Sequence, residues 1–201
     1  MKGCPVGQHE PENLPAPQTR KSTPAEIGKS ILSFVLMLAA VFAFVWLMKT
    51  FVYQAYNIPT GSMENTIMPG DMVFAEKISF RFGEPEAGDI VTFQDPRSTD
   101  DRILIKRVIA TAGQVVEIID GGVVVDGVRL EEPYVIGTTG PLATYDVSYP
   151  YTVPEGHVWV MGDNRQNSTD SRAFGAIPLS LVKERAVFIY WPFNHFGSLY
   201  K

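Results

Sequence analysis

Two residues far apart in the sequence could supply a nucleophile and its base. Ser62 follows a glycine in the segment PTGSM, so its hydroxyl could be exposed on a tight turn. Lys106 lies in ILIKRVI, whose alternation predicts a strand with Leu104, Lys106 and Val108 on one face. Burial among apolar neighbours lowers the pKa of a lysine, and a neutral amine can act as a general base. A serine nucleophile with a lysine base is therefore one chemistry open to this sequence.

Each of these motifs also has an ordinary structural explanation. Serines in turns rich in glycine and proline are usually turn residues, and a lysine on an edge strand can extend its ammonium into water. A third segment, GDNRQNSTDSR at 162–172, is rich in hydrogen-bonding side chains and follows a β-rich run. It could support a site with hydroxyls and an internal ion pair, or it could be a solvated loop. Residue types alone leave these alternatives open.

A histidine-based triad has little support in the sequence. His9 lies in a proline-rich N-terminal segment, His157 lies near a turn, and His195 belongs to the terminal segment WPFNHFG. Each is better explained as a surface or packing residue. The single cysteine, Cys4, cannot form an internal disulfide, and no Cys/His cluster has metal-ligand spacing. If Ser62 is a nucleophile, lysine is the better base, and we expect neither a metal nor another cofactor.

The elements that must position these residues are predicted to be mainly β-strands. From residue 53 onward, short β-rich runs alternate with turn signals, and no long segment has a helical period. Asp120-Gly121-Gly122 and Asp126-Gly127 predict tight hairpin turns, and residues 134–154 predict a loop or irregular insertion. We therefore expect a mainly β fold in which an antiparallel β domain follows one N-terminal helix. The expected strands are Met72–Ala75, Asp89–Gln94, Ile103–Ala110, Val115–Ile119, Val123–Val125, His157–Met161 and Val182–Trp191.

An apolar run of 18 residues, from Ile31 to Met48, contains only one polar side chain. As a helix it covers ~27 Å, close to the ~30 Å hydrocarbon core, and ~33 Å if it continues past Lys49 to Val52. It is apolar on all faces, which argues against a buried helix of a soluble protein. A cleaved signal peptide would have a shorter run followed by a small-x-small site, whereas bulky residues follow here. The run predicts an uncleaved transmembrane signal-anchor at 30–52.

The residues around this run predict how the chain is divided and oriented. Residues 1–29 contain five prolines and almost no large apolar side chains, so we expect a disordered tail. Three basic residues come shortly before the run (Arg20, Lys21 and Lys29), and only Lys49 follows before Lys77. This bias predicts a cytoplasmic N-terminus and an extracytoplasmic domain at 53–201. The net charge of −5, without a basic stripe, argues against a nucleic-acid partner.

Four sequence blocks behind the apolar run carry a family resemblance. They are PTGSMENTIMPGD (59–71), GDIVTFQDP (88–96), IKRVIATAG (105–113) and GDNRQNSTDSRAFG (162–175). In this order they resemble the bacterial type I signal peptidases, membrane-bound serine–lysine endopeptidases that cut signal peptides from exported proteins. The resemblance extends from the apolar run to the WP near the C-terminus. It implies an antiparallel β catalytic core with a small β insertion, here at about 114–160.

The resemblance assigns roles to the matched residues. Ser62 matches the nucleophile and Lys106 the general base, and Thr60 matches a hydroxyl that joins the Ser62 N–H in an oxyanion hole. Ser168 matches a hydroxyl that orients the lysine amine. A supporting ion pair and shallow pockets for small substrate residues are implied at five further positions: Asp170 with Arg172, and Ile58, Met63 and Ile105. The family cleaves after small residues of the Ala-x-Ala type through an acyl-enzyme.

The sequence also departs from the family pattern in its loops. Asn65 stands where the family often has proline, and four further positions differ: Ala110, Ala112, Gln114 and Gln166. None of these positions is assigned catalytic chemistry, so we expect differences in loop geometry.

The resemblance implies a location and partners. We expect a single-pass protein of the plasma membrane that meets exported preproteins and phospholipid near the export translocase. Three aromatic residues could dip into lipid or pack as a C-terminal strand: Trp191, Phe193 and Phe196. Two rival hypotheses are a soluble self-cleaving serine–lysine regulator, which the apolar run disfavours, and a membrane-anchored β domain that binds a partner without catalysis.

Overall fold

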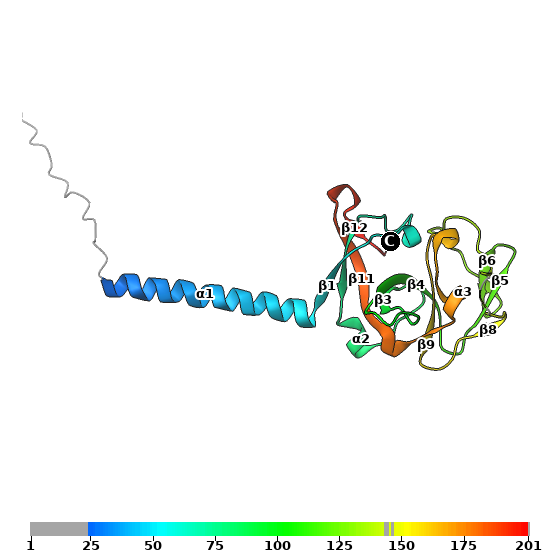
Figure 1. Ribbon diagram of the computed structural model, residues 1–201, viewed down its shortest axis with the longest axis horizontal. Coiled ribbons are helices and arrows are strands. Elements are labelled where there is room, and N and C mark those ends of the chain that lie inside the picture. Colours follow the sequence, from blue (N-terminus) through cyan, green and yellow to red (C-terminus); the bar gives the residue numbers. More distant parts are fainter. Residues whose placement is uncertain (1–23, 143–144, 146, 201) are drawn as a thin grey trace, which may run out of the picture. The chain divides into compact units, whose positions relative to one another are not determined.

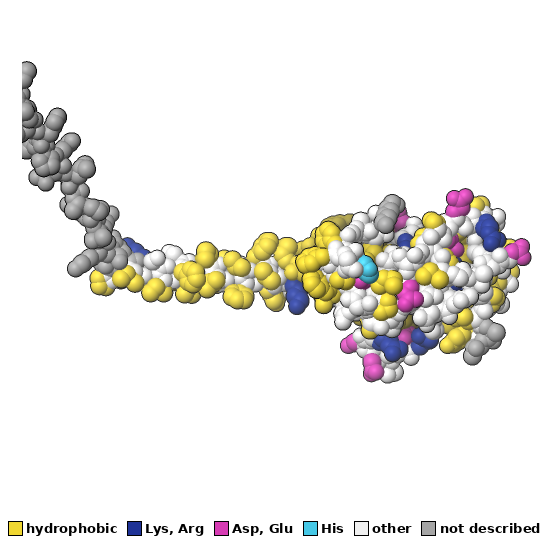
Figure 2. Space-filling view, turned by 90° about the horizontal axis from the view of Figure 1, so that it is seen from above, with side chains coloured by type: hydrophobic (Ala, Val, Ile, Leu, Met, Phe, Trp, Pro, Cys, Tyr) yellow, Lys and Arg dark blue, Asp and Glu magenta, His cyan; other side chains and the backbone are white. Residues whose placement is uncertain are grey.

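A long apolar helix opens the described part of the chain. The computed structural model describes residues 24–142, 145 and 147–200. Helix α1 covers Pro24–Phe51, and its stretch Ile27–Phe51 is long and apolar enough to cross a membrane. Apolar side chains follow its whole length (Figure 2). The helix begins six residues earlier than expected, because proline is well tolerated in a first helical turn.

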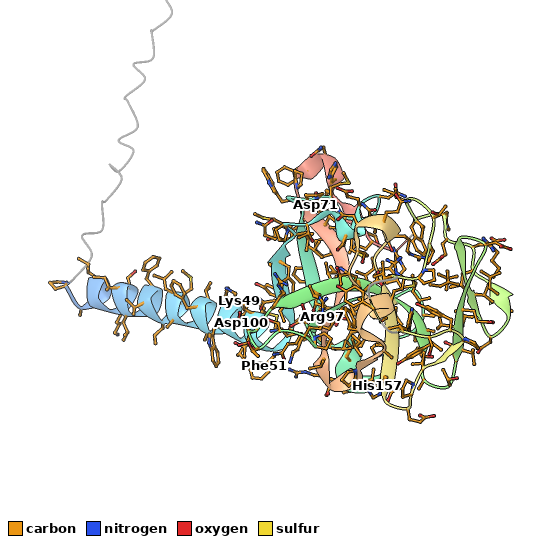
Figure 3. The ribbon with its side chains drawn as sticks, turned by 45° about the vertical axis from the view of Figure 1, so that its right-hand side comes forward. Lys49, Phe51, Asp71, Arg97, Asp100 and His157 are labelled. Carbon is orange, nitrogen blue, oxygen red and sulfur yellow. The ribbon has the colours of Figure 1, made fainter. Side chains whose placement is uncertain are left out.

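The predicted tail therefore falls into two parts. Its residues 1–23, which include Cys4 and His9, lie outside the described residues. Residues 24–29 form the first turns of α1. The C-terminal end of α1, where Figure 3 labels Lys49 and Phe51, is met by the Lys77 amine, whose Nζ lies 3.3 Å from the Lys49 carbonyl oxygen. A cation at this position satisfies free carbonyls and complements the helix dipole.

The larger of the two antiparallel sheets contains the two longest strands of the domain, β4 and β11. Within the described residues its strand order is β1-β2-β11-β3-β4-β9-β10, and β12 pairs with β11 (Figure 1). Neighbouring strands in this sheet are antiparallel, and several pairs join segments that are far apart in the sequence, as β11 does with β2 and β3. Its strands are β1 (Tyr53–Asn57), β2 (Met72–Glu76), β3 (Ile90–Gln94), β4 (Ile103–Thr111), β9 (His157–Met161), β10 (Ile177–Pro178), β11 (Val182–Trp191) and β12 (Gly197–Ser198).

A smaller sheet occupies most of the segment where an insertion was expected. Its order is β7-β6-β5-β8, with strands β5 (Val115–Ile119), β6 (Gly122–Val125), β7 (Val128–Arg129) and β8 (Tyr151–Thr152). Figure 1 shows this sheet at the side of the β domain away from β1 and β12. Strand β9 begins inside the expected range 114–160 but belongs to the larger sheet, because its backbone pairs with β4.

Both predicted hairpin turns connect strands of the smaller sheet. Asp120 and Gly121 have φ angles of 47° and 75°, and Asp126 and Gly127 have 52° and 76°. Positive φ at both central residues is what a two-residue turn needs to match the twist of its strands, and Asp-Gly tolerates it. Strands β5, β6 and β7 therefore form a meander, and the sequence predicted both of its turns.

Three apolar clusters hold the β domain together. One lies under the loop between β1 and β2, with Met63 and Ile67 fully buried. A second joins the two sheets around Trp159, which is fully buried between the rings of Tyr149 and Tyr151. The third lies along β3, β4 and β9. The first cluster matters most for function, because it fixes the loop that carries Ser62.

The expected fold class is confirmed, since the structure is mainly antiparallel β behind one N-terminal apolar helix. All seven expected strands occur, with ends that differ by at most one residue. The strands that the sequence did not indicate are β1 and four two-residue strands. Strand β1 alternates polar and aromatic residues and is defined by its pairing with β2, so its composition gives little signal.

Candidate active site

The loop between β1 and β2 presents Ser62 on a short, tightly anchored turn. The loop is closed at its base, where the Ile58 N–H donates to the Asp71 carbonyl at 3.0 Å and the Gly70 N–H donates to the Ile58 carbonyl at 2.7 Å. Gly61–Met63 forms one 3-10 turn. Met63 is fully buried in the core, whereas Ser62 is 8% exposed. The buried neighbour thus fixes the serine at the edge of the core with its hydroxyl accessible.

Asn65 gives this loop a local geometry of its own. Its φ angle is 82°, a left-handed conformation that asparagine tolerates and that the proline ring forbids. Its side-chain amide also donates to the Tyr134 carbonyl at 3.0 Å. The asparagine at this position therefore accompanies a turn that a proline could not form.

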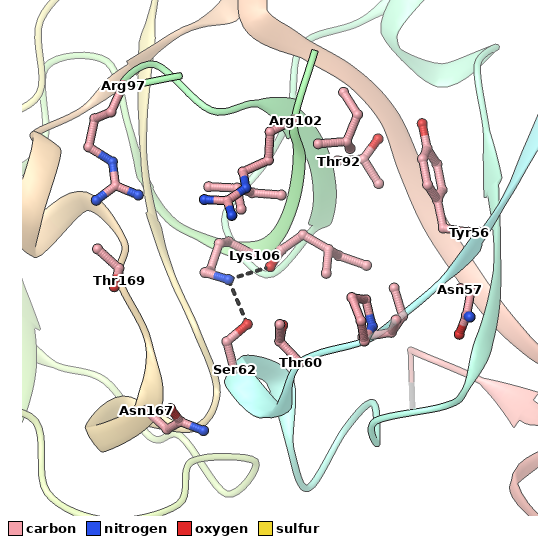
Figure 4. Close-up of a pocket in the computed structure, with 15 residues that line it drawn as sticks. Tyr56, Asn57, Thr60, Ser62, Thr92, Arg97, Arg102, Lys106, Asn167 and Thr169 are labelled. Carbon is pink, nitrogen blue, oxygen red and sulfur yellow. Dashed lines mark hydrogen bonds between the residues drawn. The ribbon is translucent and has the colours of Figure 1, made fainter. Parts of the chain in front are cut away.

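Lys106 approaches Ser62 from strand β4, which is separated from β2 by two strands in the sheet order. The Nζ of Lys106 lies 2.7 Å from Oγ of Ser62 and 2.8 Å from the carbonyl oxygen of Ile105 (Figure 4). The lysine is 3% exposed, and this burial lowers the pKa of Lys106 to about 8, against the opposing effects of Asp170 and Asp163. At pH 7 about one tenth of its amine is therefore unprotonated and able to accept a proton, far more than for a lysine with its ordinary pKa.

The segment 162–172 lies next to Ser62 and is held in place by a buried ion pair. Asp170 and Arg172 are buried, and Nε of Arg172 donates to Oδ1 of Asp170 at 2.9 Å while a terminal nitrogen donates to Oδ2 at 2.9 Å. The Asp170 carboxylate also accepts from the Gly162 N–H at 3.0 Å. It caps the four-residue helix α3 (Ser171–Phe174). A bidentate buried pair with further donors fixes the loop firmly against β9.

The same segment lies against the turn that carries Ser62, where the Asn164 N–H donates to the Ser62 carbonyl at 3.1 Å. The Ser168 hydroxyl donates to Oδ2 of Asp170 at 2.7 Å, and Lys106 bonds to Ser62 and Ile105 rather than to Ser168. A Cβ at Gly162 would lie 2.5 Å from the Ser62 carbonyl oxygen and 2.3 Å from the Ser168 hydroxyl. Only glycine fits at this position, because the backbone of the segment 162–172 lies directly against the turn that carries Ser62.

A second buried ion pair was not identified from the sequence. Nε of Arg107 donates to Oδ1 of Asp163 at 2.9 Å, and its guanidinium lies 3.9 Å from the centre of the Tyr134 ring. Asp163 also accepts from the Thr66 hydroxyl at 2.5 Å, which ties the Ser62 loop to β4 and β9. The sequence contained a sign of this ion pair. Arg107 shares one face of its strand with the apolar Ile105, and a buried arginine needs an acidic partner.

A cavity of about 430 Å³ opens beside Ser62 and Lys106. Thr60, Ile58 and Ile105 are among the residues that line it. Met63, expected to line a substrate pocket, is fully buried and is not among the lining residues, although it belongs to the same apolar cluster as Ile58 and Ile105. Arg97 and Arg102, which the sequence did not indicate, line it on the side of Asn167 and Thr169 (Figure 4). The structure thus brings a hydroxyl, a buried amine and a small apolar recess together.

The histidines of the described region are engaged elsewhere. Nδ1 of His195 lies 2.9 Å from Oδ1 of Asp71, and Nδ1 of His157 lies 2.8 Å from the Glu155 carbonyl oxygen. Figure 3 shows Asp71 and His157 on opposite sides of the β domain. Neither histidine lines the cavity at Ser62. Lysine is therefore the base that the geometry offers to this serine.

Comparisons with known proteins find similarity over most of the chain, including Ser62 and Lys106. Residues 31–191, which run from within α1 to the end of β11, match the family described as signal peptidase, peptidase S26. The chain is 37% identical to the probable signal peptidase I-1 of Synechocystis sp., over 82% of this chain and 84% of that relative. It is 32% identical to signal peptidase I of Mycobacterium tuberculosis, over 90% of this chain and 79% of the relative. A crystal structure of a signal peptidase I from Enterococcus faecalis covers 51% of this chain and 97% of its own, with 32% identity and a TM-score of 0.41.

Proposed function

Because the chain belongs to the signal peptidase family, peptidase S26, and is thus a serine protease hydrolase of the signal peptidase I type, we propose its mechanism and location. In this proposal it is a membrane-bound endopeptidase that removes N-terminal signal peptides from exported preproteins. Ser62 is the nucleophile and Lys106 its general base. The observation that carries the proposal is the 2.7 Å approach of Nζ of Lys106 to Oγ of Ser62 in a buried setting.

The first half of the reaction forms an acyl-enzyme. When Lys106 is neutral, the Ser62 hydroxyl donates its hydrogen bond to Nζ, and the amine takes this proton as Oγ attacks the scissile carbonyl. The resulting ammonium gives the proton to the leaving amine, which becomes the new N-terminus of the mature protein. The Ile105 carbonyl, 2.8 Å from Nζ, holds the amine in place through both steps.

The second half of the reaction releases the signal peptide. Neutral Lys106 removes a proton from a water molecule, which attacks the ester, and Ser62 leaves with the returned proton. In both halves the tetrahedral oxyanion is bound by the Ser62 N–H and the Thr60 hydroxyl. Thr60 supports this role because it is exposed at the cavity, and its side chain does not cap the turn that follows. Loss of one such donor typically lowers the rate by ~10²–10³.

The residues around the proposed dyad hold its loop in place and select the side chains of the substrate. We assign Asp170 and Arg172 to fixing the segment that touches the Ser62 turn, and Ser168 to the same support through its bond to Asp170. The recess at Ile58 and Ile105 accepts small side chains, which fits cleavage after Ala-x-Ala sequences. Met63 does not line the cavity but belongs to the same buried apolar cluster as Ile58 and Ile105, so we assign it to holding that recess in shape.

Helix α1 holds the enzyme at its substrate's membrane in this proposal. Signal peptides lie in the bilayer, so an anchored enzyme meets them at a high effective concentration. Ser62 lies eleven residues beyond Phe51, at most ~36–40 Å of extended chain, so the site stays near the membrane surface. The basic residues before the helix support a cytoplasmic N-terminus, a tail at 1–29 and a catalytic domain outside the plasma membrane. Phospholipid and the export translocase are then its neighbours.

Cleavage of a preprotein with an Ala-x-Ala site, in detergent with phospholipid, tests the proposed dyad. We expect the unaltered enzyme to cut after the second alanine, and Ser62→Ala and Lys106→Ala to be inactive. Lys106→Arg should also be inactive, because a guanidinium does not lose its proton.

Two exposed residues provide matched controls. Ser180→Ala and Lys183→Ala remove the same chemical groups from the surface and should retain full activity. Cleavage at the same bond by Ser62→Ala would contradict the assignment of the nucleophile. A folded wild-type enzyme that cuts no such preprotein, and that a serine-reactive probe fails to label at Ser62, would favour a binding domain without catalysis.

A further inference from the structure

The cavity beside Ser62 has a polar end that the proposed mechanism does not use. Tyr56 and Thr92 line it on the side away from Arg97 and Thr169 (Figure 4). Behind them lies Glu184 of β11, which is 7% exposed. The Tyr56 hydroxyl donates to Oε2 of Glu184 at 2.8 Å, and the Thr92 hydroxyl donates to the same oxygen. A buried carboxylate thus fixes two hydroxyl groups at one end of the cavity.

The hydrogen bonds to Glu184 determine what this end can still bind. Each hydroxyl has spent its single proton on the carboxylate, so its oxygen is left as an acceptor. The Thr92 oxygen already accepts from the Glu184 N–H at 3.2 Å, whereas the Tyr56 oxygen can still accept beside the hydrogen bond that it donates. Burial and then the neighbouring carboxylate raise the pKa of Tyr56, so the phenol keeps its proton. The cavity end is therefore a hydrogen-bond acceptor that a donating side chain would satisfy.

The geometry of an extended substrate decides which side chain reaches this end. Side chains of an extended peptide alternate, so the first and third residues before the scissile bond point to the same side, ~6–7 Å apart. The first residue lies next to Ser62, where its carbonyl is attacked. A substrate that runs along the recess of Ile58 and Ile105 brings its third residue toward Tyr56 and Thr92, which line the same cavity. This recess is small, so the donor must sit on a short side chain.

We propose that Tyr56 and Thr92, fixed by Glu184, form a subsite that selects a hydroxyl side chain, serine or threonine, at the third residue before the scissile bond. The inference rests on the proposed function and narrows its substrate class. Tyr56 and Thr92 accept the hydrogen bond of the substrate hydroxyl, and Glu184 is a positioning residue that holds both acceptors in place.

Threonine and valine at that position make a nearly isosteric test, because they differ by a hydroxyl in place of a methyl group. Three preproteins with alanine at the first position carry threonine, valine or alanine at the third. Competition of the threonine and valine forms in one reaction gives their ratio of kcat/KM, which does not depend on the fraction of enzyme that is folded. We expect the full-length enzyme to prefer threonine about tenfold, the effect of one good hydrogen bond.

Three substitutions should remove this preference. Tyr56→Phe and Thr92→Val delete an acceptor each, and their combination should bring the ratio to about one. Glu184→Gln replaces the carboxylate by a group whose amide can donate to the same hydroxyl oxygens, so it should also lower the ratio. Tyr190→Phe, on β11 but outside the cavity lining, is the matched control and should leave the ratio at its wild-type value.

The outcomes separate the inference from the proposed function. A wild-type ratio near or below one, or cleavage of the alanine preprotein alone, would overturn the subsite and leave the peptidase proposal standing. A tenfold ratio that survives Tyr56→Phe with Thr92→Val and Glu184→Gln would place the selectivity elsewhere and also overturn it. Failure of the wild-type enzyme to cut the alanine preprotein would contradict the proposed function, and the subsite would fall with it.

Discussion

The pH dependence of cleavage follows directly from the burial of Lys106. Only the neutral amine can accept the Ser62 proton, so the reaction should follow the unprotonated fraction of the lysine. With a pKa of about 8, that fraction is about one tenth at pH 7 and about nine tenths at pH 9. We therefore expect kcat/KM to rise nearly tenfold between these values and to level off above pH 9. A lysine with its ordinary pKa of 10.5 would instead give a rise of about a hundredfold without a plateau.

The assay measures kcat/KM with substrate well below KM, at constant ionic strength and detergent concentration. The preprotein should have no histidine or cysteine near the cleavage site, so that the free enzyme alone titrates. Samples returned from pH 9 to pH 7 control for irreversible loss of folded enzyme. A rate that keeps climbing through pH 10, or one that is flat from pH 6 to 9, would refute the role of a desolvated lysine.

Three further predictions concern the supporting structure. Gly162→Ala should abolish cleavage, because its Cβ would lie 2.5 Å from the Ser62 carbonyl oxygen; a preprotein assay on folded variant checks this. Arg172→Met should destabilise the fold by about 3–5 kcal/mol, because it leaves the carboxylate of Asp170 buried without its cation; thermal unfolding in detergent micelles measures the loss. Lys106→Met should unfold at a higher temperature than wild type at pH 7, with a gain of up to about 3 kcal/mol. The unfolded lysine binds its proton more tightly, so wild-type stability rises between pH 8 and 10.5, and the gain should shrink over that window.

The sequence predicted the strands and turns whose signals are local. Alternation in 103–109 located β4, and Asp-Gly pairs located both hairpin turns with the required positive φ angles. It did not predict β1 or the membership of β9 in the larger sheet. Both depend on which distant strand supplies the hydrogen bonds, and residue types within a strand do not encode its neighbour.

For the candidate site, the residue types made Ser62 and Lys106 candidates, the family resemblance assigned them roles, and the structure added what holds them. The apolar neighbours of Lys106 were compatible with a buried amine but also with a lysine that extends into water, and the 2.7 Å approach to Ser62 depends on loop closure at Ile58. The ion pair of Arg107 with Asp163 was missed, because its members are 56 residues apart in sequence. Such pairs are set by tertiary packing, and only the buried position of the arginine hinted at a partner.

The most direct test of the dyad is to identify the residue that carries the acyl group. Wild-type enzyme is mixed with a preprotein, quenched in acid and digested with trypsin, and the peptides are analysed by mass spectrometry. The tryptic peptide 50–77 contains a single serine, Ser62. We predict that this peptide gains the mass of the signal-peptide fragment, that fragmentation places it on Ser62, and that Lys106→Ala shows no such adduct. An adduct on another peptide, or an equal adduct in Lys106→Ala, would contradict the serine–lysine mechanism.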